Sequence, residues 1–202
     1  MKRKILVTAF EPFAGRKSNP ALEVLKRLRP SAFRNCRLYK EKLPVSGKII
    51  GRKISGLLSR IRPDSVIALG LAAGETAVRI ERFALNFQDY RIKDTSGYQP
   101  KGRLIKKDGP AAYFVTSNPA RLAAAVAKVR VPAYESNHAG TYVCNHLMYE
   151  ALHAITTEGF KANFSFIHLP LTTEMAALEK PVPPSLPLAA LVKAVEAIIK
   201  AT

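Results

Sequence analysis

Residues 137–146 read Asn137-His138-Ala139-Gly140-Thr141-Tyr142-Val143-Cys144-Asn145-His146. In this stretch the sequence pattern changes from that of a loop to that of a helix. From this stretch onward, apolar residues recur every four positions, at Val143, Leu147, Ala151 and Ile155. This spacing is typical of a helix with one buried face, and the preceding Gly and Thr favour a loop before it. We therefore expect a helix that begins near Val143 and carries Cys144 in its first turn.

A cysteine in the first turn of a helix lies near unpaired backbone N–H groups and the positive end of the helix dipole. Both favour the thiolate, so this position predicts a lowered pKa for Cys144 and a nucleophilic sulfur. The alternative is that Cys144 is a small buried side chain, which is the commoner role of a free cysteine. The choice between the two depends on whether the chain supplies a base for this thiol.

Length and composition indicate a globular protein. The chain has 202 residues, of which 48% are apolar, and we expect residues 1–202 to form a single domain with a substantial core. The apolar run 5–10 stops at Glu11 and is too short for a signal peptide or a membrane span, so we predict a cytoplasmic protein without a membrane partner. Cys36 and Cys144 match no disulfide framework and no zinc motif.

Basic residues are concentrated in the first third of the chain. Residues 1–62 contain 17 Lys and Arg against three acidic residues, which accounts for +14 of the net charge of +17. Such a surface attracts nucleic acid or other polyanions without regard to sequence. No RNA-binding motif with interleaved aromatic residues accompanies it, and Lys and Arg on outward helix faces usually serve solubility. Nucleic-acid binding is therefore the less favoured interpretation.

Short apolar runs alternate with helical patterns along the chain. Runs such as Ile5–Phe10 and Ser65–Leu69 are typical of strands that are buried on both faces. Further strands are expected at 36–42, 112–116, 131–134 and 162–169, and helices are expected after Asn19, Val45, Asn118, Tyr142 and Pro187. This alternation predicts a layered α/β fold with a mostly parallel sheet, whose functional site lies beyond the carboxyl ends of the strands.

Two further residues are candidates for that site. His168 ends the strand pattern 162–169, at the same sheet edge as the loop before Cys144. Glu81 lies where the apolar parity changes, and we expect a β-bulge there that turns its carboxylate inward, the alternative being a solvated edge-strand acid. The polar segment 89–110 that follows is expected to be a long loop, of the kind that is often functional.

Together, Cys144, His168 and Glu81 are the parts of a nucleophile, base and orienting-acid arrangement. Other histidines compete for these roles, because His138 precedes the helix and His146 lies two positions after the cysteine. A metal site built from the histidines and cysteines is a further alternative, although their spacing matches no common zinc motif. Spacing alone leaves these possibilities open.

Four segments of the chain form an ordered set of motifs. They are Val7-Thr8-Ala9-Phe10-Glu11-Pro12-Phe13-Ala14-Gly15, Ile80-Glu81-Arg82-Phe83-Ala84-Leu85-Asn86, Ala139-Gly140-Thr141-Tyr142-Val143-Cys144-Asn145-His146 and Phe166-Ile167-His168-Leu169-Pro170. Over essentially the whole chain, they resemble the pyroglutamyl peptidase I family of pyrrolidone-carboxylate cysteine peptidases. Smaller matches include Leu43-Pro44-Val45, and Asp94, Gly97, Gln99 and Pro100 in the long loop.

The resemblance implies a three-layer α/β/α sandwich and a cysteine peptidase that removes an amino-terminal pyroglutamyl residue from peptides through a thioester. It implies that Cys144 is the nucleophile, that His168 is the general base and acid, and that Glu81 orients the histidine. No metal or cofactor is implied, and the family often forms dimers or tetramers. Residues matching the substrate site are Phe10, Phe13, Ile92, Tyr142 and Val143 around the lactam ring, and Arg91 beside the reacting carbonyl.

The chain departs from the family pattern at 70–75, where Gly-Gln-Ala-Gly-Gly-Arg is usual. Leu71 replaces a glutamine that is thought to hydrogen-bond the lactam, and Glu75 places a negative charge where a positive one is usual. A lactam oxygen left without its donor costs on the order of 1–3 kcal/mol, and so we expect weakened or shifted specificity. Two alternatives follow, namely a peptidase scaffold that binds RNA or another polyanion, and a hydrolase of a different small N-blocked amide.

Overall fold

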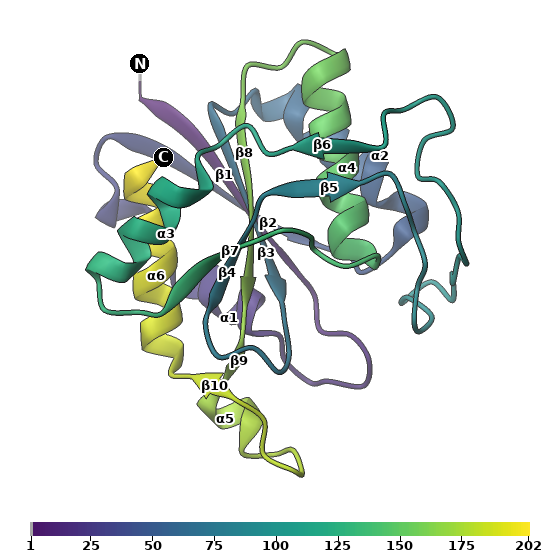
Figure 1. Cartoon of the computed structure of the whole chain (residues 1–202). Helices are drawn as coiled ribbons and strands as arrows, with labels where there is room; N and C mark the ends of the chain where they lie inside the picture. The colour runs from purple at the N-terminus through teal and green to yellow at the C-terminus, as the bar shows by residue number, and fades with distance from the viewer. Residues whose placement is uncertain (1) are drawn as a thin grey trace.

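The computed structural model describes residues 2–202 and places a mixed sheet between two layers of helices (Figure 1). Its strands, in spatial order, are β2 (Cys36–Leu43), β1 (Arg3–Phe10), β3 (Ser65–Leu71), β8 (Asn163–Leu169), β4 (Val78–Glu81) and β7 (Ala133–Ser136). Neighbouring strands are parallel except β8 and β4, which are antiparallel. The prediction of an α/β fold with a mostly parallel sheet is confirmed.

Helices cover both faces of this sheet. One layer consists of α2 (Gly47–Ile61) and α4 (Val143–Thr157), and the opposite layer consists of α1 (Pro20–Arg27), α3 (Pro119–Lys128) and α6 (Leu188–Ala201). Figure 1 shows the two layers on the right and the left of the sheet. This arrangement is the three-layer α/β/α sandwich that the family resemblance implies.

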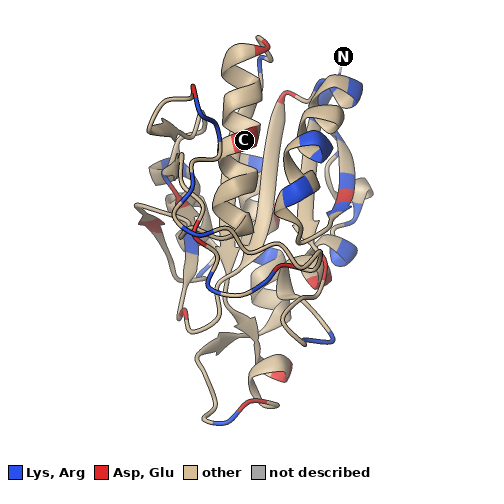
Figure 2. Ribbon diagram, turned by 90° about the vertical axis from the view of Figure 1, so that its right-hand side faces the viewer, with Lys and Arg blue, Asp and Glu red and all other residues tan. Residues whose placement is uncertain are grey.

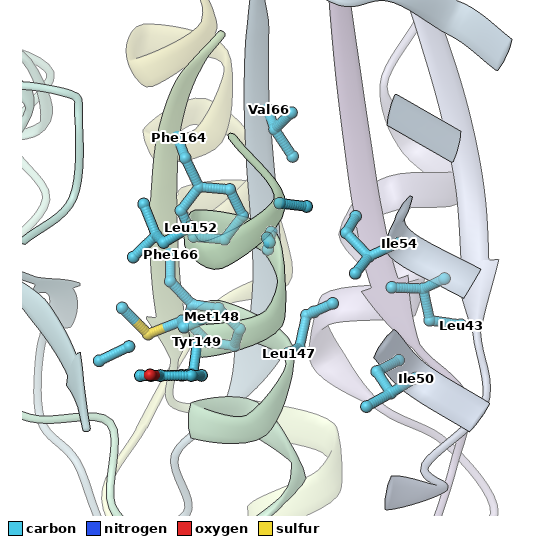
Figure 3. Close-up of a cluster of buried hydrophobic side chains, with 14 of the residues drawn as sticks. Leu43, Ile50, Ile54, Val66, Leu147, Met148, Tyr149, Leu152, Phe164 and Phe166 are labelled. Carbon is cyan, nitrogen blue, oxygen red and sulfur yellow. The ribbon is translucent and has the colours of Figure 1, made fainter. Parts of the chain in front are cut away.

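A separate apolar core fills the space on each side of the sheet. Because successive strand residues point to opposite faces, Leu6 packs in the α2/α4 layer while its neighbour Val7 packs in the other layer. Phe164 and Phe166 of β8 lie in the first core together with Leu147, Met148 and Leu152 of α4 (Figure 3). Strands that serve two cores are apolar almost throughout, which explains the continuous apolar runs in the sequence.

Three helix starts lie where the sequence predicts them. The Asn19 side chain accepts a hydrogen bond from the Ala21 backbone N–H at 3.0 Å at the start of α1. Asn118 does the same for the Arg121 N–H at the start of α3, also at 3.0 Å. In both cases proline is the first helical residue, as expected for an asparagine followed by proline. The third start is that of α4 at Val143.

Smaller elements lie outside the main sheet. Two short pairs of strands are present, β5 (Phe83–Leu85) with β6 (Ala112–Phe114), and β9 (Leu171–Thr172) with β10 (Ser185–Leu186). Short helical turns are η1 (Pro30–Ala32) and α5 (Thr173–Ala176). Between β5 and β6, residues 86–111 contain no helix and only one isolated β-bridge, which confirms the predicted long loop.

The predicted β-bulge near Glu81 is wrong. β4 ends at Glu81 and β5 begins at Phe83, and the two strands belong to different sheets. The change of apolar parity therefore marks a change of sheet. Within β4, Val78 and Ile80 pack into the core of the α1/α3/α6 layer, so ordinary alternation turns Glu81 toward α4 without any bulge.

Charged residues are spread over the outer surfaces, and Figure 2 shows basic segments near the amino terminus and on the helix below it. Several of the basic side chains are paired with acids. Lys26 and Arg27 both contact Glu23, and Arg60 contacts Glu41 at 2.7 Å. Within residues 2–202, none of the helices combines the length and the apolar character needed to cross a membrane.

Candidate active site

His168 lies at the end of β8 and is only 4% exposed. Its neighbour in the parallel ladder is Gly70 of β3, and its neighbour on the other side is Arg79 of β4. A Cβ atom on Gly70 would lie 3.0 Å from the His168 ring and 2.9 Å from the Phe166 ring. Gly70 therefore leaves the space in which the imidazole sits.

Glu81 and His168 are in direct contact. The His168 Nδ1 atom lies 2.7 Å from Glu81 Oε1, and the Glu81 side chain is fully buried. A carboxylate accepts hydrogen bonds, so Nδ1 carries the hydrogen and donates it to Glu81. In the neutral ring, Nε2 then keeps its lone pair and is able to accept a proton. The structure thus brings together two of the three residues expected to act in catalysis.

Cys144 is the second residue of α4, as the helical pattern predicts, and it retains partial solvent exposure. Burial raises the pKa of its thiol to about 12, and the negative charge of Glu81 adds to the rise. The Cys144 backbone N–H and the positive charge of Arg79 act in the opposite direction, to lower the pKa. The sulfur therefore lies within electrostatic range of the Glu81 carboxylate.

The expectation that the helix start lowers the net pKa of Cys144 is wrong. The backbone N–H does favour the thiolate, but the cost of burying a charged sulfur in its apolar surroundings is larger. Near neutral pH the free protein therefore holds Cys144 as the thiol. A nucleophilic role for this residue requires a base that removes its proton during the reaction, and His168, at the end of β8, is the residue expected to act as that base.

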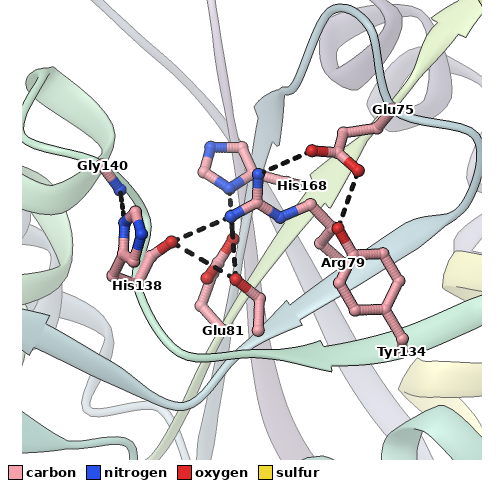
Figure 4. A network of polar contacts seen from close by, with 8 residues as sticks. Glu75, Arg79, Glu81, Tyr134, His138, Gly140 and His168 are labelled. Carbon is pink, nitrogen blue, oxygen red and sulfur yellow. Dashed lines mark hydrogen bonds and ion pairs between the residues drawn. The ribbon is translucent and has the colours of Figure 1, made fainter.

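Arg79 lies beside the histidine and glutamate and makes contacts on several sides (Figure 4). One guanidinium nitrogen is 3.3 Å from Glu81 Oε1 and also donates to Ser136 Oγ at 2.8 Å and the His138 carbonyl at 2.9 Å. The other nitrogen donates to Glu75 at 3.0 Å. The Arg79 side chain therefore connects Glu81 to the loop that leads to Cys144.

Aromatic rings lie next to Cys144 along the start of α4. Tyr142, which immediately precedes α4, stacks on Phe13 with 6.0 Å between ring centroids and meets Tyr90 at 4.7 Å. Its hydroxyl donates to the Lys93 carbonyl at 3.2 Å. Because a phenol has one hydrogen, that of Tyr142 is already used and does not replace the donor missing at Leu71.

The remaining predicted substrate residues lie in different environments. Phe10, at the end of β1, is 3% exposed, and Val143 is 1% exposed, so both belong to the apolar core. Leu71 and Ile92 are half-buried, and Leu71 ends β3 opposite Leu169. Arg91 is exposed, and its charge lowers the pKa of Tyr142 against the larger raising effect of burial, which places it near that ring. Their contact with substrate stays a prediction.

The other histidines are engaged in local contacts. His146 Nδ1 lies 2.9 Å from the Tyr90 hydroxyl, His153 Nδ1 lies 2.9 Å from the Tyr113 hydroxyl, and His138 accepts from the Gly140 N–H at 3.1 Å. Across the part of the chain that the structure describes, no three His, Cys, Asp or Glu side chains are grouped so as to hold a metal ion.

Asn145, next to Cys144, attaches α4 to the β5 segment. It is fully buried, its Oδ1 accepts from the Leu85 N–H at 2.9 Å, and its Nδ2 donates to the carbonyls of Leu85 and Phe87 at 2.9 Å each. Asn145→Ala leaves these backbone groups without partners, so we expect a loss of about 1–3 kcal/mol in the free energy of unfolding. Urea denaturation measures this loss.

The matched control for Asn145 is the exposed Asn163 at the start of β8. We expect Asn163→Ala to change the free energy of unfolding by no more than about 0.5 kcal/mol. Equal destabilisation by the two substitutions would contradict a specific role for the Asn145 contacts.

Reasoning from the sequence missed three residues that shape this site, namely Gly70, Arg79 and Ser136. A signal was present for Arg79, because strand alternation places it on the same face as Glu81, two positions away. No comparable signal exists for Ser136, which pairs with Glu81 only through the β4–β7 ladder. Its place in the site depends on a strand pairing that local sequence does not specify.

Comparison with known proteins identifies close relatives. The sequence model of a family described as pyroglutamyl peptidase matches residues 3–202. The pyrrolidone-carboxylate peptidase 1 of Caldanaerobacter subterraneus subsp. tengcongensis is 41% identical over 98% of this chain and 96% of its own length. The pyrrolidone-carboxylate peptidase of Thermococcus onnurineus is 40% identical over 98% of this chain and 97% of its own length.

Solved structures show the same similarity in three dimensions. The pyrrolidone carboxyl peptidase from Thermococcus litoralis superposes with a TM-score of 0.94 at 35% identity and covers 98% of this chain and 92% of that one. The pyroglutamyl peptidase I from Bacillus amyloliquefaciens also has a TM-score of 0.94, at 33% identity, and covers 100% of this chain and 95% of that one.

Proposed function

This chain belongs to the pyroglutamyl peptidase family, and we propose that it removes amino-terminal pyroglutamate from peptides with Cys144 as nucleophile, His168 as general base and acid, and Glu81 as the residue that orients the histidine. The observation that carries the assignment of roles is the buried 2.7 Å contact between Glu81 and His168. A neutral thiol needs a general base to remove its proton. An imidazole that is held at Nδ1 and has Nε2 available, at the end of β8, can act as that base.

In the first half of the reaction, His168 Nε2 takes the proton from the Cys144 thiol as the sulfur attacks the carbonyl carbon of the pyroglutamyl residue. The carbonyl oxygen becomes an oxyanion, to which the Cys144 backbone N–H in the first turn of α4 would donate a hydrogen bond. Collapse of this intermediate breaks the C–N bond, and the His168 imidazolium protonates the departing amine. A thioester between Cys144 and the pyroglutamyl group remains.

In the second half, a water molecule attacks the thioester carbonyl while His168 Nε2 accepts its proton. Collapse breaks the C–S bond, releases pyroglutamic acid and returns the proton to the sulfur. The negative charge of Glu81 stabilises the imidazolium in both halves, and its contact with Nδ1 leaves Nε2 as the nitrogen that exchanges protons.

Substrate recognition is proposed to rest on an apolar ring site. Phe13 and Tyr142 already stack on each other, and Val143, Phe10 and Ile92 would add apolar contacts to a bound lactam ring. Arg91 would lie beside the reacting carbonyl. The Leu71 side chain has no hydrogen-bond donor, and the Tyr142 hydroxyl already donates to the Lys93 carbonyl. Neither side chain would therefore donate to the lactam oxygen, and the reduced specificity expected from Leu71 stays a prediction.

Three broader features complete the proposal. Residues 1–202 act as one domain, since the family match spans 3–202. The protein works in the cytoplasm, where a reactive cysteine stays reduced. It forms a homo-oligomer, as the family resemblance implies, and the exposed Leu178 and Val182, at 87% and 69% exposure, provide apolar surface for such an interface.

The substrate assignment predicts strong discrimination between two amides that share a five-membered ring. Pyroglutamyl amides have a neutral lactam, whereas prolyl amides have a charged amine whose desolvation in an apolar site is costly. We expect kcat/KM for a pyroglutamyl chromogenic amide to exceed that for the prolyl amide by at least about 100-fold. Initial rates with both amides at one pH measure this ratio.

Prior alkylation of Cys144 is the control for that measurement, and it should remove the pyroglutamyl activity. Turnover that is equal for both amides, or that survives alkylation of Cys144, would contradict the proposal. Preference for a different N-blocked amide would redirect the substrate assignment to the alternative hydrolase.

A further inference from the structure

We propose that Arg79 is a positioning residue that keeps His168 in its proton-accepting form, by holding a positive charge against the carboxylate that His168 shares. This inference rests on the proposed function, because it assigns His168 the role of base. It goes further in naming a residue outside the catalytic three that adjusts the protonation of the histidine.

The position of Arg79 is fixed by the sheet. It pairs directly with His168 in the antiparallel β4–β8 ladder, so the two side chains lie on the same face. It also precedes Glu81 by two residues on β4, which places all three side chains together. The Arg79 side chain is 18% exposed, and its Nε atom is buried without a hydrogen-bond partner. Burying an arginine in this way costs free energy unless its charge is paired with an acidic group.

The buried carboxylate of Glu81 has few contacts other than Arg79 that stabilise its negative charge. Of its two oxygens, Oε2 is buried and has no hydrogen-bond partner among residues 2–202. Oε1 alone receives both His168 Nδ1, at 2.7 Å, and the Arg79 guanidinium, at 3.3 Å. Without Arg79, the fully buried carboxylate would have only the imidazole as a partner, and it would stabilise a proton on that ring.

Arg79 therefore opposes the resting protonation of His168 in two ways. It balances the Glu81 charge, and it repels a positive charge on the imidazole. The Arg79 guanidinium nitrogen and His168 Nδ1 contact the same oxygen of Glu81, so these two nitrogens are at most about 6 Å apart. At this separation, one charge in a protein shifts the titration of the other by about one to two pH units. A neutral His168 accepts the Cys144 proton, and a destabilised imidazolium is the better acid toward the leaving amine.

The other titratable groups around this pair come from several elements. Glu75 in the β3–β4 loop contacts Arg79 at 3.0 Å, and the Tyr134 hydroxyl of β7 donates to Glu75 at 2.7 Å. Cys144 faces Glu81 from α4, and the His138 ring, in the preceding loop, accepts from Gly140. Figure 4 shows Glu75 in contact with Arg79. The charge of Glu75 partly offsets that of Arg79, so the two residues are expected to act on His168 in opposite directions.

Glu75, which the resemblance marks as a departure from the family pattern, has a partner of opposite charge in this structure. The negative charge at a position where a positive one is usual is paired with Arg79, four residues later in the chain. The positive charge in this region is that of Arg79, which lies on β4 next to Glu81. Without Arg79, Glu75 would add negative charge near Glu81 and make His168 protonate still more readily.

A purely structural role is the alternative, because Arg79 also donates to Ser136 and to the His138 carbonyl in the segment that leads to Cys144. The two roles differ in what they require of the side chain. A structural anchor depends on the forked guanidinium, so lysine would replace it poorly. A charge effect depends on the positive charge, so lysine would preserve it.

The experiment is an NMR titration of the His168 ring in the wild type and in Arg79→Gln, Arg79→Lys and Glu75→Gln. We expect the midpoint pH of the His168 titration to rise by about one to two pH units in Arg79→Gln and to fall in Glu75→Gln. Arg79→Lys should stay within about 0.5 pH units of the wild type. The acidic limb of the kcat/KM profile should move in the same directions.

The control is Arg82→Gln, which removes a nearby but half-exposed arginine whose partner is Glu135 at 3.7 Å, and it should leave the His168 midpoint unchanged. An unchanged midpoint in folded Arg79→Gln would overturn the proposal. If that variant does not fold, the downward shift in Glu75→Gln decides, and its absence overturns the proposal as well. The titration requires no turnover, so failure of the peptidase assignment would be seen separately, as an inactive wild type.

Discussion

Cys144→Ala is expected to abolish hydrolysis of a pyroglutamyl chromogenic amide, with a loss of at least about 10⁴-fold in kcat. The substitution removes the sulfur that is proposed to form the thioester, and the remaining backbone N–H of the helix start cannot replace it. Since the residue keeps partial solvent contact, alanine leaves no large cavity. Steady-state rates at matched protein concentration measure the loss, and the unfolding transition shows whether the fold is retained.

Cys36→Ala is the matched control, because Cys36 is the other free cysteine and begins β2 at the far edge of the sheet. It should keep activity within about twofold of the wild type, as is usual for a substitution remote from the site. Residual turnover by Cys144→Ala above about 1% of the wild type would contradict the assignment of the nucleophile.

His168→Asn is the second substitution with a large expected effect. It removes the Nε2 atom that is proposed to accept the thiol proton, and burial raises the pKa of that thiol to about 12, so a base is required near neutral pH. We expect kcat to fall by about 10³- to 10⁴-fold. Glu81→Gln should also lower kcat, by about 10²- to 10⁴-fold, because a glutamine amide no longer stabilises the imidazolium.

His153 provides a control for this series, because it lies further along α4 than Cys144 and contacts Tyr113. His153→Gln is expected to leave kcat within about twofold of the wild type. Additive losses in the double variant of Cys144 and His168 would contradict the account, since residues that act as one unit give strongly non-additive effects.

Much of the fold follows from local patterns. Asn19 and Asn118, each followed by proline, mark helix starts that the structure confirms, and the four-residue apolar spacing places the start of α4 at Val143. The continuous apolar run 5–10 indicates a strand covered on both faces. These features depend on backbone geometry and side-chain alternation within a few residues, which is why the sequence predicts them.

Other features depend on contacts between distant segments. The four residues of β4 carry no signal for running antiparallel to β8, yet this pairing places Arg79 beside His168. The parity change after Ile80 has two explanations, a bulge or a change of sheet, and only the tertiary structure distinguishes them. The pKa of Cys144 is likewise a tertiary property, because burial outweighs the helix start that the sequence reveals.

The measurement that tests the central claim most directly is the mass of the intact protein, quenched in acid during turnover of a pyroglutamyl substrate. A thioester at Cys144 predicts a fraction of chains heavier by one pyroglutamyl group, carried on the peptide that contains Cys144 and lost again when substrate is exhausted. Turnover without this adduct, or an adduct on Cys36 in its place, would contradict a thioester mechanism at Cys144.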